Sequence, residues 1–195
     1  MNPEIEATFV NINKDDYRTK LKSVGAKLKQ PEILMKRVVF DLGAQSFIRV
    51  RDEGNKITLS YKKVDDLSLS GMKEICLEVN DYDEAVNFVK ACGFNLKSRQ
   101  ETYREEWGLD GTEITIDTWP WLPTYTEIEG PSEEAVKSVA KKLGFDMKDA
   151  HYGSACEIYQ IYYDVTAHDI NYCPEIKFTK IPEWLASKRR SEVKF

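Results

Sequence analysis

Acidic side chains recur at every second position in two short stretches of the chain. In EIEATF, Glu4 and Glu6 would share one face of a strand with Ile5 on the other, because side chains alternate along a strand. The same spacing pairs Glu127 with Glu129 in TYTEIEG. Carboxylates two positions apart lie about 7 Å from each other and repel by about 2 kcal/mol at an effective dielectric constant of about 20. An oxygen-preferring divalent cation, Mg²⁺ or Mn²⁺, relieves this repulsion most directly.

Basic side chains alternate in the same way and supply the opposite charge. Arg49 and Arg51 share a face in FIRVR, and Lys97 and Arg99 have the same spacing in LKSRQ. Lys62 lies near the end of the alternating stretch KITLSYKK. Guanidinium and ammonium groups donate charge-assisted hydrogen bonds to phosphate oxygens. These bases therefore favour a polyphosphate, bridged by the metal, as the ligand.

A solvated outer face is the simpler explanation for any one of these strands. Across the whole set, however, the opposite faces carry Ile, Leu, Val and Phe, and three amphipathic helices need an apolar sheet surface to pack on. If those helices lie outside, the charged faces point into the interior of a barrel. Buried charges there must be satisfied by water, by one another or by a ligand, because isolated ones are costly.

The periodicities predict an α+β fold. Capping residues and glycines bound three helices, from Asn13 to Gly25, from Asp81 to Gly93 and from Ser132 to Gly144. Eight strands are expected at residues 3–12, 34–41, 46–52, 56–63, 72–80, 96–107, 112–118 and 124–130. Their hairpin order favours a closed eight-stranded antiparallel β-barrel, or tunnel, with the amphipathic helices packed outside.

Composition limits the classes of partner. The chain has 195 residues, of which 42% are hydrophobic, so one sizeable core is expected. A mixed net charge of −5 argues against nonspecific binding of a nucleic acid backbone. The four cysteines are far apart, which disfavours a disulfide framework or a zinc site. No apolar run approaches the roughly 18 residues of a membrane span, so we expect a cytoplasmic protein with no membrane partner.

The last segment, 149–195, has a different pattern. Ser154 and Glu157 form a capping-box pattern that predicts a helix near 155–166, and Pro182 could open a short final helix. No Gly/Ser linker separates this segment from the rest. We therefore expect a single domain, 1–195, with the tunnel core at about 1–148 and the extension at about 149–195 packed on it.

The order of the charged motifs resembles that of the CYTH family, also called triphosphate tunnel metalloenzymes. The motifs are the opening ExE, RxR in FIRVR, the lysine that ends LSYK, ExxxE in KEICLEV, KxR in KSR and D…ExE in IDTWPWLPTYTEIEG. This family includes class IV adenylate cyclases, thiamine triphosphatases and inorganic triphosphatases. The resemblance covers about residues 3–148 and implies an eight-stranded tunnel that binds a triphosphate with Mg²⁺ or Mn²⁺.

The resemblance also implies roles for individual residues. The metal ligands would be Glu4, Glu6, Asp117, Glu127 and Glu129. The phosphate-binding residues would be Arg49, Arg51, Lys62, Lys97 and Arg99. Glu74 and Glu78 would orient the bases or a second ion. One position departs from the family pattern ExExK, because Thr8 stands where the lysine is usual and supplies no positive charge; Lys36, on a neighbouring strand, is a candidate to compensate.

Three functions remain open for such a site. The leading hypothesis is metal-dependent hydrolysis of a triphosphate by water. The second is class IV adenylate cyclase chemistry, in which the ribose 3′-hydroxyl attacks the α-phosphate of ATP and pyrophosphate leaves. The third, motivated by Thr8, is a non-catalytic module that binds a nucleotide or polyphosphate. The candidate ligands are ATP, thiamine triphosphate and tripolyphosphate, and a homodimer is left open as the assembly.

Overall fold

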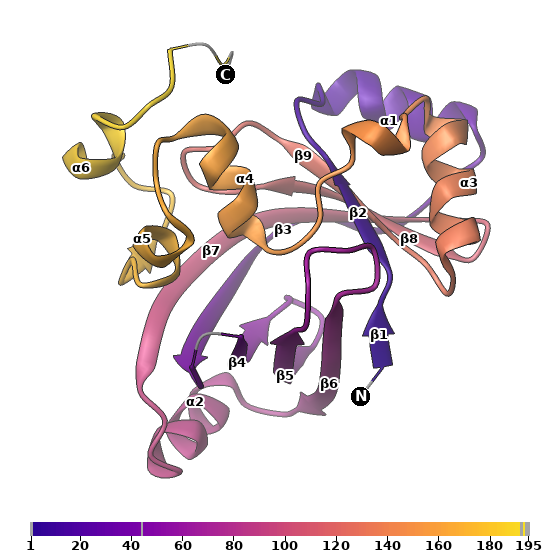
Figure 1. Ribbon diagram of the computed structural model, residues 1–195. Coiled ribbons are helices and arrows are strands. Elements are labelled where there is room, and N and C mark those ends of the chain that lie inside the picture. The colour runs from indigo at the N-terminus through magenta and orange to yellow at the C-terminus, as the bar shows by residue number, and fades with distance from the viewer. Residues whose placement is uncertain (1, 44, 192, 194–195) are drawn as a thin grey trace.

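The computed structural model describes residues 2–43, 45–191 and 193. Its strands are β1 (Asn2–Glu4), β2 (Glu6–Phe9), β3 (Lys27–Asp41), β4 (Ser46–Asp52), β5 (Ile57–Val64), β6 (Met72–Val79), β7 (Leu96–Leu109), β8 (Thr112–Thr118), β9 (Tyr125–Glu129) and β10 (Glu175–Ile176). Within the described residues these strands form one curved sheet in the order β1-β6-β5-β4-β3-β7-β8-β9-β2, with β10 beside β7 (Figure 1). All neighbours are antiparallel except β10 and β7, which are parallel.

The amino-terminal segment contacts both ends of this sheet order. Only Ile5 separates β1 from β2, yet Glu4 of β1 pairs with Met72 of β6, whereas Glu6 of β2 pairs with Glu129 of β9. The antiparallel α+β prediction is confirmed. The hydrogen-bonded path is nevertheless an open one that starts at β1 and ends at β2, not the closed eight-stranded ring expected from the sequence. The expected strand at 3–12 divides into two because its halves pair with different partners.

The three predicted helices are present as α1 (Lys14–Ser23), α2 (Tyr82–Ala91) and α3 (Glu133–Leu143). The side chains of Asn13, Asp81 and Ser132 accept backbone hydrogen bonds at their amino ends, as the capping pattern predicts. Helices α1 and α3 lie over β2, β8 and β9, and α2 lies against β4 at the other end of the sheet (Figure 1). The helices therefore cover the outer face of the sheet.

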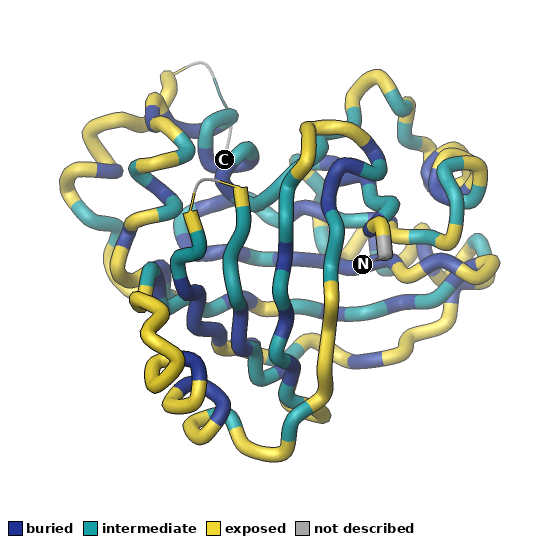
Figure 2. The backbone as a smooth tube through the Cα atoms, turned by 60° about the horizontal axis from the view of Figure 1, so that its bottom comes forward, coloured by how far each residue is buried: buried dark blue, intermediate teal, exposed yellow. Residues whose placement is uncertain are grey.

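The aliphatic faces of the strands form the cores under these helices. Under α2, Val38 of β3 and Val50 of β4 are fully buried against Val86. Under α1 and α3, Ile114 of β8 and Ile128 of β9 are likewise fully buried. Exposed positions gather in loops, on helix turns and along parts of β3 and β6, while the other strands are mainly buried or intermediate (Figure 2). The outward direction of the aliphatic side chains leaves the opposite face of each strand to the charged ones.

The carboxy-terminal segment packs on the sheet through aromatic side chains. It contains a short 3₁₀ helix (Met147–Asp149), α4 (Ala155–Tyr162), α5 (Ala167–Asn171) and α6 (Glu183–Ala186). Helix α4 begins at the predicted capping box, and α6 follows Pro182 as expected. The buried Tyr159 hydroxyl donates to the Pro120 carbonyl at 2.7 Å. All four cysteines are free thiols, and none of the described helices has the length and apolar character to cross a membrane.

Candidate functional site

A cavity of about 560 Å³ lies on the inner face of the curved sheet, within the range of about 300–1,000 Å³ typical of small-molecule sites. Side chains from all of the strands β1 to β9 line it. On β4, for example, Arg49 and Arg51 line the cavity, whereas Ile48 and Val50 pack with α2 on the other face. The sheet therefore concentrates charged side chains around one cavity.

Most of the charged residues singled out from the sequence meet at this cavity. Those that line it are Glu4, Glu6, Arg49, Arg51, Lys62, Glu74, Lys97, Glu127 and Glu129. Those that do not line it are Thr8, Lys36, Glu78, Arg99 and Asp117. For the residues of the second group, alternation along the strand was not sufficient to predict whether the side chain lines the cavity.

A β-bulge separates Lys97 from Arg99. The ladder between β3 and β7 shifts register where Ser98 pairs with Val39 and Leu96 pairs with Phe40, so Lys97 is left without a partner. The alternation of side chains is interrupted there. Lys97 consequently lines the cavity while Arg99 does not, which corrects the expectation that the two share a face.

Arg37, and not its neighbour Lys36, contributes a cationic side chain to the cavity wall. Lys36 is exposed and lies outside the cavity, so it does not compensate for Thr8. Arg37 lies on the opposite face of β3, between the cavity-lining residues Met35 and Val39. Thr8 itself is buried, and its backbone N–H donates to the His151 carbonyl at 3.0 Å.

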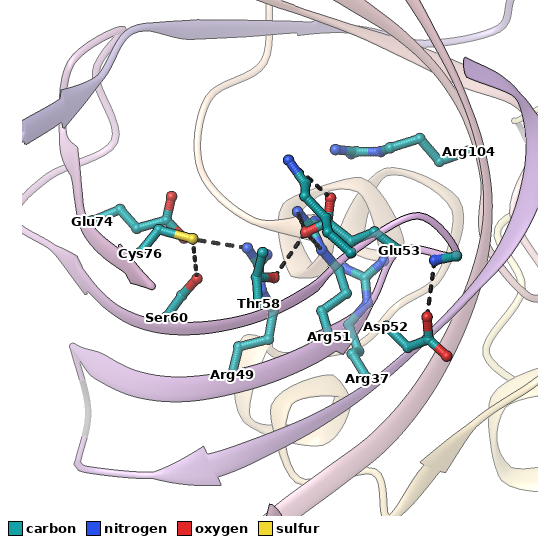
Figure 3. A network of polar contacts seen from close by, with 12 residues as sticks. Arg37, Arg49, Arg51, Asp52, Glu53, Thr58, Ser60, Glu74, Cys76 and Arg104 are labelled. Carbon is teal, nitrogen blue, oxygen red and sulfur yellow. Dashed lines mark hydrogen bonds and ion pairs between the residues drawn. The ribbon is translucent and has the colours of Figure 1, made fainter. Parts of the chain in front are cut away.

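Four guanidinium groups point into the same part of the cavity, and we call them the arginine cluster (Arg37, Arg49, Arg51 and Arg104). Figure 3 shows three of them rising from β3 and β4, with Arg104 of β7 approaching from the other side. Arg37 and Arg49 retain only 5% and 9% of their exposed surface. Arg37 also donates to the Thr102 hydroxyl, and Arg49 donates to Glu74 at 3.3 Å. Arg37 and Arg104 come from predicted strands but were not identified from the sequence.

Two members of the arginine cluster are incompletely paired. The Nε atoms of Arg37 and Arg49 are buried without a hydrogen-bond partner in the described structure. Burial, followed by repulsion from Arg51, lowers the pKa of Arg49 to about 10 and also lowers the pKa of Arg37. A buried donor without an acceptor is costly, and more so when it carries charge. An anion placed beside these two groups would supply the missing acceptors.

The other two members are held by carboxylates. Arg51 donates from Nε and Nη2 to one oxygen of Glu53, at 2.9 and 2.7 Å. Arg104 makes two parallel hydrogen bonds with Asp117, both of 2.8 Å, and a third with Glu127 at 2.6 Å. Burial opposes the charge on Arg104, but Asp117 and Glu127 outweigh it and raise the pKa of the guanidinium. These contacts fix the two side chains in position.

Four glutamates from β1, β2 and β9 form a carboxylate cluster (Glu4, Glu6, Glu127 and Glu129). Glu4 accepts two hydrogen bonds from Lys62, at 2.7 and 2.8 Å, and Glu127 is paired with Arg104. In the described structure, Glu6 and Glu129 have no such cationic partner. Burial and then repulsion from Glu127 raise the pKa of Glu6 to about 8.

The pKa of Glu129 is raised as well, although its side chain is exposed. Desolvation in the cavity, followed by repulsion from Glu4 and Glu113, raises its pKa to about 7. Glu6 and Glu129 are cross-strand neighbours, so their carboxyl groups resist ionising together. A cation bound between β2 and β9 would offset the repulsion and allow both carboxyl groups to ionise.

The carboxylate cluster fits a hard divalent cation by its chemistry, because all of its donors are oxygen atoms. Among the described residues, however, no three Asp, Glu, Cys or His side chains are gathered closely enough to hold an ion as they stand. Asp117 is fully buried and accepts from Thr115 at 2.5 Å as well as from Arg104. In this arrangement Asp117 lies on the cavity side of the sheet, orients Arg104 and does not itself line the cavity.

Comparison with solved structures finds the same fold in proteins of low sequence identity. A conserved hypothetical protein from Pyrococcus furiosus has a TM-score of 0.69 at 23% identity, covering 80% of this chain and 99% of that one. A "putative adenylate cyclase" from Vibrio parahaemolyticus also has a TM-score of 0.69, at 12% identity, covering 82% of this chain and 98% of the other.

A third neighbour is a "putative adenylyl cyclase" from Hippeastrum that is described as having a dominant triphosphatase activity. Its TM-score is 0.54 at 17% identity, and the match covers 80% of this chain and 92% of that one. A comparison with curated protein sequences gave no match. The model of the CYTH domain matches residues 2–162, which include β1 to β9 and α4 and therefore nearly all of the cavity wall. This chain belongs to the CYTH domain family.

Proposed function

We propose that this chain is a metal-dependent triphosphatase, in which segment 2–9 completes a closed tunnel and the arginine cluster holds the triphosphate. The proposal combines family membership, a cavity of suitable size and the separation of cationic and anionic side chains within it. The assignment of residues 1–195 to one domain, with the extension forming part of it, belongs to the same proposal.

One observation carries the proposal: the buried, unpartnered Nε atoms of Arg37 and Arg49. An arginine in a purely structural role is expected to have its donors satisfied by carboxylates or carbonyls, as those of Arg104 are. Phosphate oxygens are strong acceptors, and a triphosphate offers many of them along a short chain. An anion of this kind would satisfy both Nε donors and remove the mutual repulsion of the guanidinium groups.

The metal would be held by Glu6 and Glu129, with Glu4 and Glu127 beside them. Mg²⁺ or Mn²⁺, when bound there, would offset charge on the phosphate oxygens. The chain itself provides a preorganised field, because the arginine cluster is fixed before substrate binds. Arg104 and the pair Arg37 and Arg49 approach from different sides of the cavity, which suits the alignment of a phosphorus atom between attacking and leaving oxygens (Figure 3).

Hydrolysis is preferred over cyclisation as the reaction. The Hippeastrum protein of the same fold is described by a dominant triphosphatase activity despite its cyclase name. Hydrolysis also needs only a water molecule beside the bound triphosphate, whereas cyclisation requires the ribose to be placed as well. The cyclase and the non-catalytic binding module are therefore outcomes of the test below.

A product assay tests this function. The protein is incubated with tripolyphosphate, ATP and thiamine triphosphate, each with Mg²⁺ or Mn²⁺ and with a chelator as control, and phosphate, pyrophosphate and cyclic AMP are measured. We expect metal-dependent release of phosphate from at least one substrate. Cyclic AMP with pyrophosphate would instead identify a cyclase. Tight binding without any product would identify a binding module, and the absence of both binding and turnover would overturn the proposal.

A further inference from the structure

We propose that the substrate is a triphosphate ester whose organic group binds to a wall built by the segment beyond the family domain. We call this surface the tail wall (Ala167, Ile170 and Asn171 of α5, and Ile176 of β10). The inference rests on the proposed function and names the class of substrate for the same cavity. Inorganic tripolyphosphate would then be bound less well than an ester.

The tail wall lines the cavity although it lies outside the matched family domain. The CYTH model ends at residue 162, whereas all four residues of the tail wall contribute to the lining. Ile170 and Ile176 are buried in one apolar cluster with Trp119 and Tyr125, which line the cavity as well. The cavity thus has an apolar side in addition to its charged one.

The apolar side of the cavity is adjacent to the arginine cluster. The guanidinium carbon of Arg37 lies 4.7 Å from the centre of the Trp119 ring, in a cation–π contact. A triphosphate held by Arg37 and Arg49 would therefore place any group esterified to it close to Trp119 and the tail wall. Tripolyphosphate exposes only anionic oxygens, which gain nothing from an apolar surface. Ile170 and Ile176 are already buried, so the gain comes from the organic group itself, which would remove its own apolar surface from water at about 25 cal/mol per Å².

The tail wall is fixed to the sheet and is already formed. The backbone N–H of Arg99 donates to the Pro174 carbonyl at 2.9 Å, and the Ser98 hydroxyl donates to the Cys173 carbonyl at 2.6 Å. The Nζ atom of Lys97 lies 4.7 Å from the centre of the Tyr172 ring. Binding against a preformed surface costs less ordering entropy than binding that must first fold a loop.

Asn171 adds a polar group to the tail wall. Asn171 lines the cavity, and its side-chain amide makes no hydrogen bond to the other described residues. An amide offers both a donor and an acceptor, which suits a heterocycle or a hydroxyl-bearing group and gives nothing to a purely aliphatic one. The organic group is therefore expected to carry heteroatoms.

A binding experiment with two variants tests this inference. Dissociation constants for ATP, thiamine triphosphate and tripolyphosphate are measured by calorimetry with Mg²⁺. In the unmodified protein, we expect at least one ester to bind about tenfold more tightly than tripolyphosphate. Ala167→Trp fills the space beside α5 and should weaken that ester by about tenfold or more, with tripolyphosphate changed by less than about twofold. Asn171→Ala, which only removes an amide, should weaken the ester by about threefold.

The control is Ala186→Trp, which adds the same side chain at an exposed position of α6 outside the cavity and should change neither ligand. Thermal unfolding of each variant identifies loss of fold. If Ala167→Trp fails to fold, Asn171→Ala decides alone. Equal weakening of ester and tripolyphosphate, or esters that bind no better than tripolyphosphate, would overturn the inference and leave the proposed function standing. Failure of all three ligands to bind would refute the proposed function instead.

Discussion

The arginine cluster and the carboxylate cluster lie in one cavity but respond to burial in different ways. A glutamate that is repelled by its neighbours can take up a proton, and Glu6 does so readily because its pKa is raised to about 8. An arginine holds its proton under nearly all conditions, so Arg37 and Arg49 remain cationic although their Nε atoms lack partners. The basic side therefore requires an anion at pH values well below about 10, the pKa of the buried Arg49, whereas the acidic side requires a cation only once it ionises. Four experiments follow from this contrast.

The largest effect is expected on the free energy of unfolding, which should respond differently to the loss of a carboxylate-paired arginine and of an unpaired one. Arg104→Met should lower the free energy of unfolding in urea by about 3–5 kcal/mol, because it leaves the fully buried Asp117 without its partner. Arg37→Met removes a buried cation that no carboxylate holds, so stability should be unchanged or higher by about 1–2 kcal/mol. An equal loss in both variants would show that Arg37 is structural.

The second effect is on ligand affinity. Arg49→Met should weaken tripolyphosphate binding by at least about a hundredfold, because two charge-assisted hydrogen bonds at about 1.5–3 kcal/mol each are lost. Arg99→Met is the matched control, since Arg99 lies outside the cavity and its loss should change the affinity by less than about twofold. Similar losses from the two substitutions would mean that overall charge, and not the cavity, binds the anion.

The third effect is the pH dependence of metal binding. With a pKa of about 8, Glu6 is about 1% ionised at about pH 6 and half ionised at about pH 8. Mn²⁺ affinity, measured by electron paramagnetic resonance, should therefore rise by at least about fiftyfold over this interval, since Glu129, with its pKa raised to about 7, ionises within it as well. Glu6→Gln should flatten the profile as well as weaken binding. A pH-independent affinity in the unmodified protein would contradict this assignment.

The same titration affects the metal-free protein in the opposite direction. The folded state holds the Glu6 proton more tightly than the unfolded chain does, because burial raises the pKa of this carboxyl group. Its contribution to the free energy of unfolding is therefore full below about pH 4.5, declines as the pH rises above that value and is lost by about pH 8. Saturating Mn²⁺ should reverse this loss.

The smallest effect distinguishes a positioning residue from a metal ligand. Asp117→Asn keeps the shape of the side chain but weakens its grip on Arg104, so tripolyphosphate affinity should fall by about fivefold, or about 1 kcal/mol. Mn²⁺ affinity without triphosphate should stay the same, because Asp117 does not line the cavity and both of its oxygens accept hydrogen bonds from Arg104 or Thr115. A large loss of Mn²⁺ binding would restore Asp117 to the ligand set that the family resemblance implies.

Sequence reasoning worked where the strands are short and regular. On β4, one face is aliphatic and the other is basic, so the inward direction of Arg49 and Arg51 followed from alternation alone. The register of β4 with β5 is continuous, and Lys62 of β5 also lines the cavity as expected. A helix on the outside and a charged interior then follow from the same pattern.

The long strands β3 and β7 were harder because their pattern is irregular. Both faces of β3 near Arg37 are apolar, so no contrast between the faces indicates which one is inside. The bulge at Lys97 has no glycine or proline to mark it in the sequence and is visible only in the pairing with β3. Arg104 lies among polar residues on β7 and gives no distinct signal. Arg37 and Arg104 can be assigned to the cavity only once the register of β3 and β7 is known.

The division of the first nine residues between β6 and β9 bears on how the chain is made. During synthesis this segment leaves the ribosome well before β9, which ends at Glu129, more than a hundred positions later. Its second half must therefore wait, unpaired, for most of translation, and its docking is a late step that depends on contacts distant in sequence. A fusion partner placed at the amino terminus would interfere with that step even where it leaves the finished protein undisturbed.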